Sequence, residues 1–544
     1  MERFGNAVAG PARSQAGGFG SWVLFFTGLV LLSFILYFRV IAYPYLYDDW
    51  AVLKNAAAQT PMDYLAQVFS PEGKVLYRPL GLLYMFAVQR LFGDNPVPFH
   101  LAALVLHAAN ALLTALVVNR LFGERRLACA AGLVYLGAFS AHLVPLLWLS
   151  GIFDLGGTFL SLLALLFFLQ GRALPAAAAL LAALFFKESS LLTPAVMAAC
   201  GLVLPDGTSP TPLRFREIGE RVAPSAAIAV AFAALKLFGQ SPFALSEGHP
   251  YYLALQPRSM GVNLLRYATW GVQALLPPFA VLAPETAKAA AGAAVGAGVL
   301  VLAYSLARMR RYFKGPQRLG PATDRREWAL WAWVLLGLAP VLPLPNHAFR
   351  YYLVFSLPAL AAIALLWARR GLTGCRIRSE RQPTWLLVLA LLHVSSAVAF
   401  LPVFDARACG LAEHQEATFV CQGKRVAMAR EALRQAFLGE RRLPERSAIV
   451  FDRLDVWAFH RNAGPRLWLS DESLEVYALE EIKRDASGLY VQDVARDQVE
   501  AHYLKPAGAE KRYLDPRRTF LFRFGDHPSP RVEEAALPVE IGPP

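Results

Sequence analysis

Residues 22–40 read WVLFFTGLVLLSFILYFRV and contain one charged side chain, Arg39, next to the last position. A helix of this length, rising about 1.5 Å per residue, crosses the roughly 30 Å hydrocarbon core of a bilayer. Backbone groups in lipid are satisfied only within helices, so each such block indicates a membrane helix. The other apolar blocks are 101–118, 127–143, 155–169, 174–186, 191–204, 223–237, 289–306, 328–344, 351–367 and 385–400. The sequence predicts an α-helical polytopic membrane protein with about eleven transmembrane helices.

The formal net charge of +13 could indicate nucleic-acid binding, but the positions of the charges argue against it. With the N-terminus inside, the loops assigned to the cytoplasm hold about twenty Lys and Arg, against about eight outside. The basic excess is therefore a topology signal, and no nucleic-acid partner is expected. Segment 260–283 is interrupted by Arg266 and by Pro277-Pro278. We interpret it as an amphipathic helix on the outer surface, because a crossing there would place the basic stretch 308–326 outside.

The composition divides the chain into three parts. Residues 1–20 are expected to be a cytoplasmic tail, and 21–402 a transmembrane domain whose first outer loop, 43–98, carries short helices along the membrane. Residues 403–544 are charged and mixed, and an odd number of crossings places them outside as a small extracytoplasmic α/β domain. Its expected elements are strands at 447–451, 467–469, 488–491 and 519–524 and a helix at 426–437.

Only two of the five cysteines, Cys409 and Cys421, fall outside on this topology. An oxidising compartment lets a disulfide persist, so a bridge between them and a pair of free thiols are both open.

Ionisable residues at a membrane boundary are costly and are candidates for function. Asp48 and Asp49 follow the first helix, where adjacent carboxylates suit a base and its partner, or simply cap a helix. Arg78 stands before a proline, suited to bind a phosphate or to snorkel to the interface. Asp154 begins a helix from the outside and either orients an acceptor or caps that helix.

Two further positions carry isolated charges. Lys187-Glu188 joins two apolar blocks with almost no loop, so the lysine either pairs with its neighbour or meets an anionic head group. Arg350 follows block 328–344 and is again a cation at the outer boundary. By contrast, His107 and Asn110 lie one turn apart within a helix and are expected to bond between helices.

On the charge-derived topology, these charged side chains face one side of the membrane. The set comprises Asp48, Asp49, Arg78, Asp154, Lys187 and Arg350. Acids and isolated cations gathered at one boundary are what a substrate linked to a lipid phosphate requires.

At these residues the chain resembles the GT-C superfamily of membrane glycosyltransferases, closest to protein O-mannosyltransferases of the TMTC kind (glycosyltransferase family 39-like) and their bacterial relatives. The matching elements are Asp48-Asp49, Arg78-Pro79-Leu80, Phe99-His100 with His107 and Asn110, His142 ahead of Asp154, Lys187-Glu188, and Arg350-Tyr351. Leu143 stands where the family has a proline, and no tetratricopeptide repeats follow. A glycan, a lipid and a protein therefore all stay open as the acceptor.

The resemblance implies an inverting glycosyltransferase of a bacterial plasma membrane that takes a hexose, mannose among the candidates, from a polyprenyl phosphate. It implies Asp48 as the base with Asp49 beside it, and Arg78, Lys187 and Arg350 as ligands of the donor phosphate. Supporting or acceptor-binding roles would fall to Asp154, His142, Glu188, His347 and Tyr351. No His/Cys ligand set is visible, so no cofactor is called for and a divalent cation stays open.

Two other functions compete with this one. A transporter or flippase for lipid-linked glycans also needs cations in the membrane, but it would spread them along the bundle interior and needs no Asp-Asp pair. A non-catalytic GT-C-like scaffold is the second alternative, and the presence of Asp48, Arg78 and Lys187 argues against it.

Overall fold

The computed structural model describes residues 19–71, 76–203, 215–238, 247, 249–276, 322–411, 415–437, 443–452, 454–460, 462–471, 473–485, 487–492, 511–524 and 532–536. The expected helix at 289–306 lies outside these residues, as does nearly all of the expected tail 1–20.

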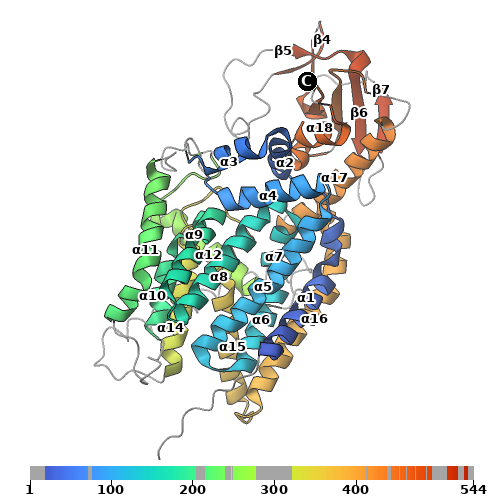
Figure 1. Ribbon diagram of the computed structural model, residues 1–544. Coiled ribbons are helices and arrows are strands. Elements are labelled where there is room, and N and C mark those ends of the chain that lie inside the picture. Colours follow the sequence, from blue (N-terminus) through green and yellow to red (C-terminus); the bar gives the residue numbers. More distant parts are fainter. Residues whose placement is uncertain are drawn as a thin grey trace, which may run out of the picture.

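Helices dominate the described chain, and every apolar block that falls within it is helical over most of its length (Figure 1). The helices of the first half are α1 (Phe19–Tyr37), α2 (Asp49–Ala58), α3 (Pro61–Phe69), α4 (Pro79–Phe92), α5 (Val97–Phe122), α6 (Arg125–Gly137), α7 (Phe139–Leu147), α8 (Ile152–Leu169), α9 (Ala173–Phe186), α10 (Thr193–Gly201), α11 (Phe215–Phe238) and α12 (Pro257–Leu275). Those of the second half are α14 (Ala322–Leu338), α15 (Leu357–Gly374), α16 (Gln382–Arg407), α17 (Gln415–Phe437) and α18 (Ala463–Leu469). The short helices expected in the first outer loop are α2, α3 and α4.

Five helices of the described chain are long and apolar enough to cross a membrane, namely α1, α5, α8, α11 and α16 with their flanking turns. The pair α6 and α7 adds a sixth span if the two are taken together across their 56° bend. Helices α4 and α9 are apolar but shorter, and α12 is not among the helices apolar enough to cross a membrane. The predicted helical membrane fold is confirmed, while the count of eleven crossings stays a prediction.

The bend between α6 and α7 frees backbone carbonyls inside the bundle. His107 Nε2 lies 3.2 Å from the Leu136 carbonyl oxygen, and the Tyr37 hydroxyl donates to the same oxygen. Nearby, the Asn110 amide donates to the Leu155 carbonyl at 3.0 Å. Side chains of neighbouring helices thus provide hydrogen-bond partners for backbone carbonyls at and near this break, as backbone groups inside a membrane require. The expected interhelical bonds of His107 and Asn110 are confirmed.

Different segments of the chain lie at the two ends of the bundle. Helices α2, α3 and α4 and the C-terminal strands lie at one end, and the junction of α15 and α16 lies at the other (Figure 1). At that second end Arg369 pairs with Glu124, and Arg126 donates to the Thr384 hydroxyl at 3.1 Å. The basic side chains at this junction therefore gather away from α2–α4.

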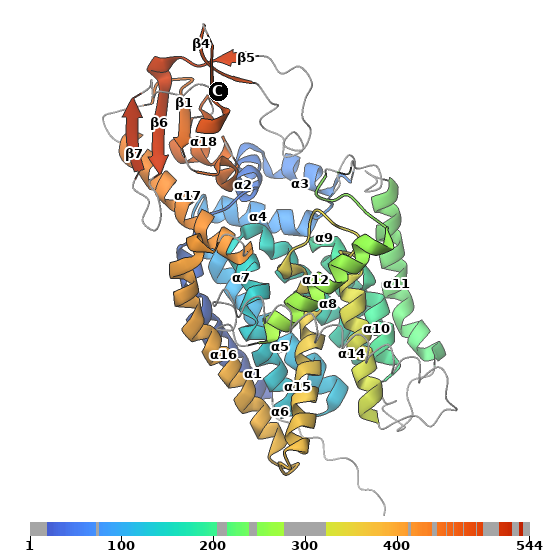
Figure 2. The ribbon, with the colours of Figure 1, turned by 180° about the vertical axis from the view of Figure 1, so that it is seen from behind.

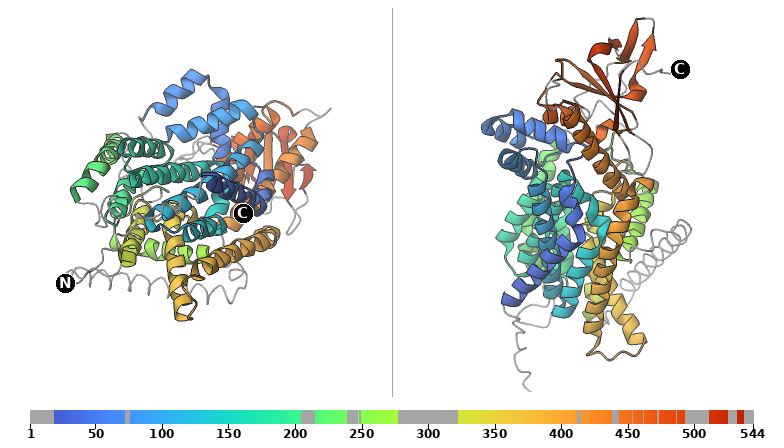
Figure 3. Two further views of the ribbon diagram at one scale, coloured as in Figure 1. Left: turned by 60° about the horizontal axis from the view of Figure 1, so that its bottom comes forward. Right: turned by 90° about the vertical axis from the view of Figure 1, so that its right-hand side faces the viewer.

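The C-terminal part is a small α/β unit that stands on the α2–α4 end of the bundle (Figures 2 and 3). Its strands are β1 (Ala448–Asp452), β2 (Glu475–Ala478), β3 (Lys483–Asp485), β4 (Gly488–Gln492), β5 (Lys511–Tyr513), β6 (Thr519–Phe524) and β7 (Val532–Ala536). One sheet has the order β2-β1-β6-β7, with β1 parallel to both of its neighbours, and the other has the order β3-β4-β5. The apolar core of the bundle continues into this unit through Ile449, Phe451 and Phe522.

One expected strand is wrong. Residues 467–469 end the helix α18 instead of forming a strand. An apolar run of this length does not distinguish helix from strand, and the preceding Pro465 is tolerated because it lies in the first turn.

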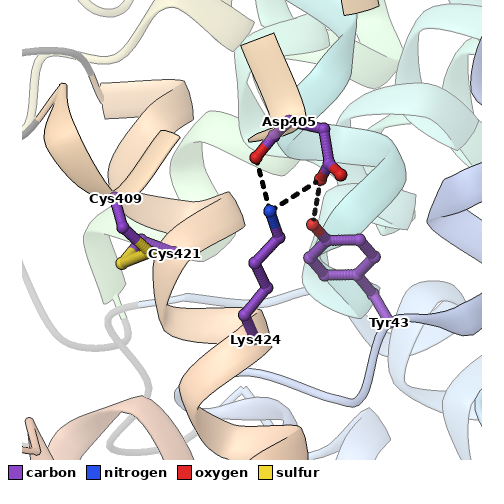
Figure 4. The surroundings of a disulfide bond; sticks show 5 residues. All are labelled: Tyr43, Asp405, Cys409, Cys421 and Lys424. Atoms are coloured by element: carbon purple, nitrogen blue, oxygen red, sulfur yellow. Dashed lines mark hydrogen bonds and ion pairs between the residues drawn. A yellow bond between two sulfur atoms is a disulfide. The ribbon is translucent and has the colours of Figure 1, made fainter. Parts of the chain in front are cut away.

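A disulfide joins Cys409, in the turn after α16, to Cys421 of α17 (Figure 4). Of the two options open from the sequence, the bridge is the one formed. Beside it, the Tyr43 hydroxyl donates to Asp405 at 2.6 Å, and Lys424 lies 3.4 Å from the same carboxylate. These contacts hold the start of α17 against the ends of the first and last bundle helices.

Candidate active site

The two adjacent carboxylates have different surroundings. Asp49 is fully buried and accepts four hydrogen bonds, from the backbone N–H groups of Leu46, Leu149 and Ser150 and from the Ser150 hydroxyl, at 2.9–3.1 Å. Burial and the charge of Asp48 raise the pKa of Asp49, and these donors lower it. With its acceptor positions occupied, Asp49 ties the loop before α2 to the end of α7.

Asp48 is the member of the pair that lines a cavity. It precedes α2 but makes no capping bond with its side chain, which instead accepts from the Trp148 indole N–H at 3.1 Å. Burial raises the pKa of Asp48 to about 6, against the opposing effects of Trp148 and of the Arg78 charge. A carboxyl that ionises near neutral pH matches a general base.

Arg78 is fixed by a carboxylate far along the chain. Its Nε donates to Glu188 at 2.9 Å and its Nη2 to the other oxygen, a bidentate pair. The guanidinium also lies 5.1 Å from the Phe153 ring centroid, and Gly81 gives that ring room. Burial raises the pKa of Glu188, but the charge and hydrogen bonds of Arg78 and the charge of Lys187 together outweigh burial and lower it to about 2.

Lys187 forms the second buried ion pair, with Asp154 of α8. The two side chains are 5% and 7% exposed. The ammonium nitrogen also lies 4.6 Å from the Tyr352 ring centroid and 5.2 Å from that of Tyr351. Close packing of α8 on α9 allows the pair, since a Cβ added at Gly157 would lie 3.2 Å from the Lys187 Cβ.

These groups surround one cavity of about 150 Å³. Of the residues predicted from the sequence, it brings together Asp48, Arg78, Asp154, Lys187 and Tyr351. Its lining also includes residues that the prediction lacked, namely Val52, Leu76, Leu82, Trp148, Ser150, Phe153, Tyr251 and Tyr352. Carboxylates and cations thus share one space with aromatic side chains.

The other predicted residues are not in this lining. Arg350 lies 3.2 Å from the Glu416 carboxylate and 5.7 Å from the Trp270 ring centroid. His142 is buried with its ring 4.3 Å from that of His107. The ring of His347 is 4.5 Å from that of Tyr251, one layer behind the cavity. Asp49 and Glu188 also stand behind it, each bonded to a residue of the lining.

Sequence reasoning did not identify Tyr251 or the direct role of Trp148. Tyr251 follows a proline in the loop before α12, and the repeated tyrosines there were the available signal. Trp148 lies shortly before Asp154 in the sequence, and of these two residues only Asp154 was predicted to belong to the site. Across the described ranges, no group of three or more His, Cys, Asp or Glu side chains is arranged to hold a metal ion.

Comparison with known proteins gives structural similarity only. No protein-family model matches the chain, and no curated protein matches its sequence. ArnT from Cupriavidus metallidurans bound to undecaprenyl phosphate is similar over 84% of this chain and 86% of its own, with 14% identity and a TM-score of 0.47. The apo state of ArnT has 14% identity and a TM-score of 0.33. The Archaeoglobus fulgidus oligosaccharyltransferase in the apo form is similar over 85% of this chain and 64% of its own, with 12% identity and a TM-score of 0.40.

Proposed function

We propose that this protein is a membrane glycosyltransferase that moves a sugar from a polyprenyl phosphate to an acceptor hydroxyl, with Asp48 as the base. The observation that carries the proposal is the cavity at the α2–α4 end of the bundle. There a carboxyl whose pKa is about 6 shares a space of about 150 Å³ with Arg78 and Lys187. A base opposite two buried cations suits a reaction in which an alcohol loses a proton while a phosphate gains charge.

The acids that pair with the cations would prepare the phosphate site. A guanidinium has five N–H donors and an ammonium three. Glu188 engages two donors of Arg78, and Asp154 engages one of Lys187. The remaining donor capacity is held in a fixed orientation before the donor binds, which reduces the reorganisation needed during the reaction.

The reaction proceeds as a single displacement. Asp48 accepts the proton of the acceptor hydroxyl as its oxygen attacks the anomeric carbon. The bond between that carbon and the phosphate oxygen breaks, the configuration inverts, and the polyprenyl phosphate leaves as an anion next to Arg78 and Lys187. Because this leaving group needs no proton, a general acid is not required. Asp154 and Tyr351 are assigned to orient the substrates, and Arg350 to position its segment through Glu416.

We assign this chemistry to the extracytoplasmic side of a bacterial plasma membrane. The basic junction of α15 and α16 lies at the end of the bundle opposite α2–α4 (Figure 1), and such junctions stay in the cytoplasm. Residues 21–402 would then form the catalytic domain and 403–544 an extracytoplasmic domain. The acceptor, whether glycan, lipid or protein, meets the sugar on that side.

The test uses purified protein in detergent or nanodiscs with radiolabelled polyprenyl-phosphate sugars and a crude envelope fraction as the acceptor. Asp48→Asn should lower transfer by about 10²–10⁴-fold, as for positioned acid–base groups, and leave folding intact. Asp63→Asn is the matched control, because Asp63 is an exposed carboxylate of the same outer loop. Near-normal transfer by Asp48→Asn would refute the role of Asp48. A wild-type protein that transfers none of the sugars would refute the function.

A further inference from the structure

The loop that carries Asp48 is held from the C-terminal side as well as by the bundle. Tyr47, the residue before Asp48, has φ +53, a left-handed conformation that residues other than glycine adopt at a cost. Its backbone N–H donates to the carbonyl of Ala458, in the turn after β1, at 2.7 Å. The C-terminal unit thus supplies a bond that compensates for the strained backbone next to the candidate base.

Phe419 of α17 makes a second contact with the same loop. Its ring lies 5.1 Å from that of Tyr47 in an edge-on arrangement and 5.7 Å from that of Trp148. Trp148 is the residue whose indole N–H bonds to the Asp48 carboxylate. Phe419, itself 8% exposed, is therefore wedged between the residue that precedes the base and the residue that orients it.

The start of α17 is anchored around Phe419. Glu416, which is 2% exposed, pairs with Arg350, and Gln415 donates to the Ala348 carbonyl at 2.9 Å. Two residues beyond Phe419, Cys421 is bonded to Cys409. An aromatic ring on a helix held at both of these points keeps a fixed position, which a ring on a free loop would lack.

We propose that Phe419 is a positioning residue that holds Tyr47 and Trp148 in place, so that the C-terminal unit completes the site around Asp48. The proposal rests on the proposed function, since positioning matters only if Asp48 reacts. Phe419 acts through its neighbours and does not line the cavity. It gives the C-terminal unit a part in the reaction that does not depend on which acceptor is used.

Three variants test the proposal. Phe419→Ala removes the side chain that lies between Tyr47 and Trp148. Phe419→Leu keeps a large apolar side chain but loses the aromatic ring, and Phe419→Tyr keeps the ring. A loss of position of about 1 Å costs on the order of 100-fold in rate, so Phe419→Ala should lower kcat by about 10- to 100-fold while KM for the donor stays close to wild type. Phe419→Leu should lie between, and Phe419→Tyr should restore most of the rate.

The pH profile of kcat/KM is a second measurement. A general loss of stability does not change the pH at which its acidic limb falls. Water that reaches Trp148 in Phe419→Ala would reduce the burial that raises the pKa of Asp48. The acidic limb of kcat/KM should then shift below its wild-type position near pH 6. The control is Phe520→Ala, which removes a ring of the same unit that packs on Phe437 at 5.1 Å. Its limb should not move.

Hydrogen exchange separates this inference from the proposed function. The Tyr47 amide should exchange faster in Phe419→Ala than in wild type, and equally in Phe520→Ala and wild type. Exchange could be faster in Phe419→Ala while the wild-type protein shows no transferase activity. In that case the proposed function is wrong, and the contact of Phe419 with Tyr47 and Trp148 is only structural. Unchanged exchange, rate and pH limb in Phe419→Ala and Phe419→Leu would overturn the inference, whatever the wild-type activity.

Discussion

Breaking the pair of Lys187 and Asp154 should destabilise the protein far more than breaking an exposed pair. Both side chains are less than a tenth exposed, at 5% and 7%, so either partner alone would be a buried charge without compensation. Such a loss costs about 3–5 kcal/mol, whereas replacing both members is often nearly neutral. The exposed pair of Arg216 and Glu220, 89% and 62% exposed, should contribute only about 0.3–0.5 kcal/mol.

The assay is a double-mutant cycle with Lys187→Met, Asp154→Ala and their combination. Unfolding by SDS in mixed micelles, followed by circular dichroism, gives the free energy of each variant. Asp154 faces the cavity, so its truncation adds little empty space to the packed core. Each single variant should lose about 3–5 kcal/mol, and the double variant should recover most of that loss. The coupling, which is the sum of the two single losses minus the loss of the double variant, should then be about 5 kcal/mol or more.

If the losses of the two single variants add up to the loss of the double variant, the reasoning is refuted, because the two charges then do not stabilise each other. The same cycle at Arg216→Ala and Glu220→Ala calibrates the method, since a coupling above about 1 kcal/mol there would show that the assay overstates ion pairs.

Further outcomes are expected at other positions. The proposed base Asp48 would act as a carboxylate and its pKa is about 6, so kcat/KM should rise with pH through that value; a flat profile from pH 5 to 8 would contradict this. Arg78→Ala should weaken donor binding by about 2–5 kcal/mol, and Arg78→Lys should not restore it, because lysine cannot pair bidentately with Glu188; wild-type donor dependence in both would place the phosphate elsewhere. Cys409→Ser should lower stability by about 3 kcal/mol, from the loss of a bridge that closes a 12-residue separation, as an unfolding titration would show. In intact cells an impermeant thiol reagent should label Ser487→Cys but not the exposed native Cys375. The opposite pattern would mean that the C-terminal unit lies in the cytoplasm and the α15–α16 junction outside it.

The sequence was sufficient to group the charged residues at one end of the bundle. Asp48, Arg78, Asp154 and Lys187 each stand at the junction of an apolar helix, and helix parity assigns such junctions to one face or the other. Burial inside lipid limits where charges lie, so their places can be predicted before their contacts. Four of the positions singled out in this way line one cavity.

The pairing of those charges could not be predicted. Lys187 and Glu188 are adjacent, and mutual pairing was the simplest option for them. Lys187 has an extended backbone, with φ −156 and ψ 131, and neighbouring side chains of an extended chain point to opposite sides. Lys187 therefore pairs with Asp154, 33 residues away, and Glu188 pairs with Arg78, 110 residues away. Such partners depend on helix packing, which local sequence does not encode.

The same limit applies to Arg350. Its partner Glu416 lies in the part of the chain that the composition assigned to a separate domain, so no local pattern connects the two residues. The prediction of Arg350 as a phosphate ligand therefore rests on its position at the boundary and on the resemblance of Arg350-Tyr351 to the family. The contacts of α17 with the bundle, including those of Phe419, could not be predicted from the sequence for the same reason.

The bend between α6 and α7 has a consequence for how the chain is assembled in the membrane. The Leu136 carbonyl is satisfied by Tyr37 and His107, which both precede it in the sequence and are synthesised first. When α6 enters the bilayer, its partners in α1 and α5 are already there, so the broken span need not expose an unpaired carbonyl to lipid. A chain translated in the order α6, α7, α1, as in a circular permutant, would lack these partners at insertion. We expect such a permutant to be retained by membrane quality control even though it contains every contact of the finished fold.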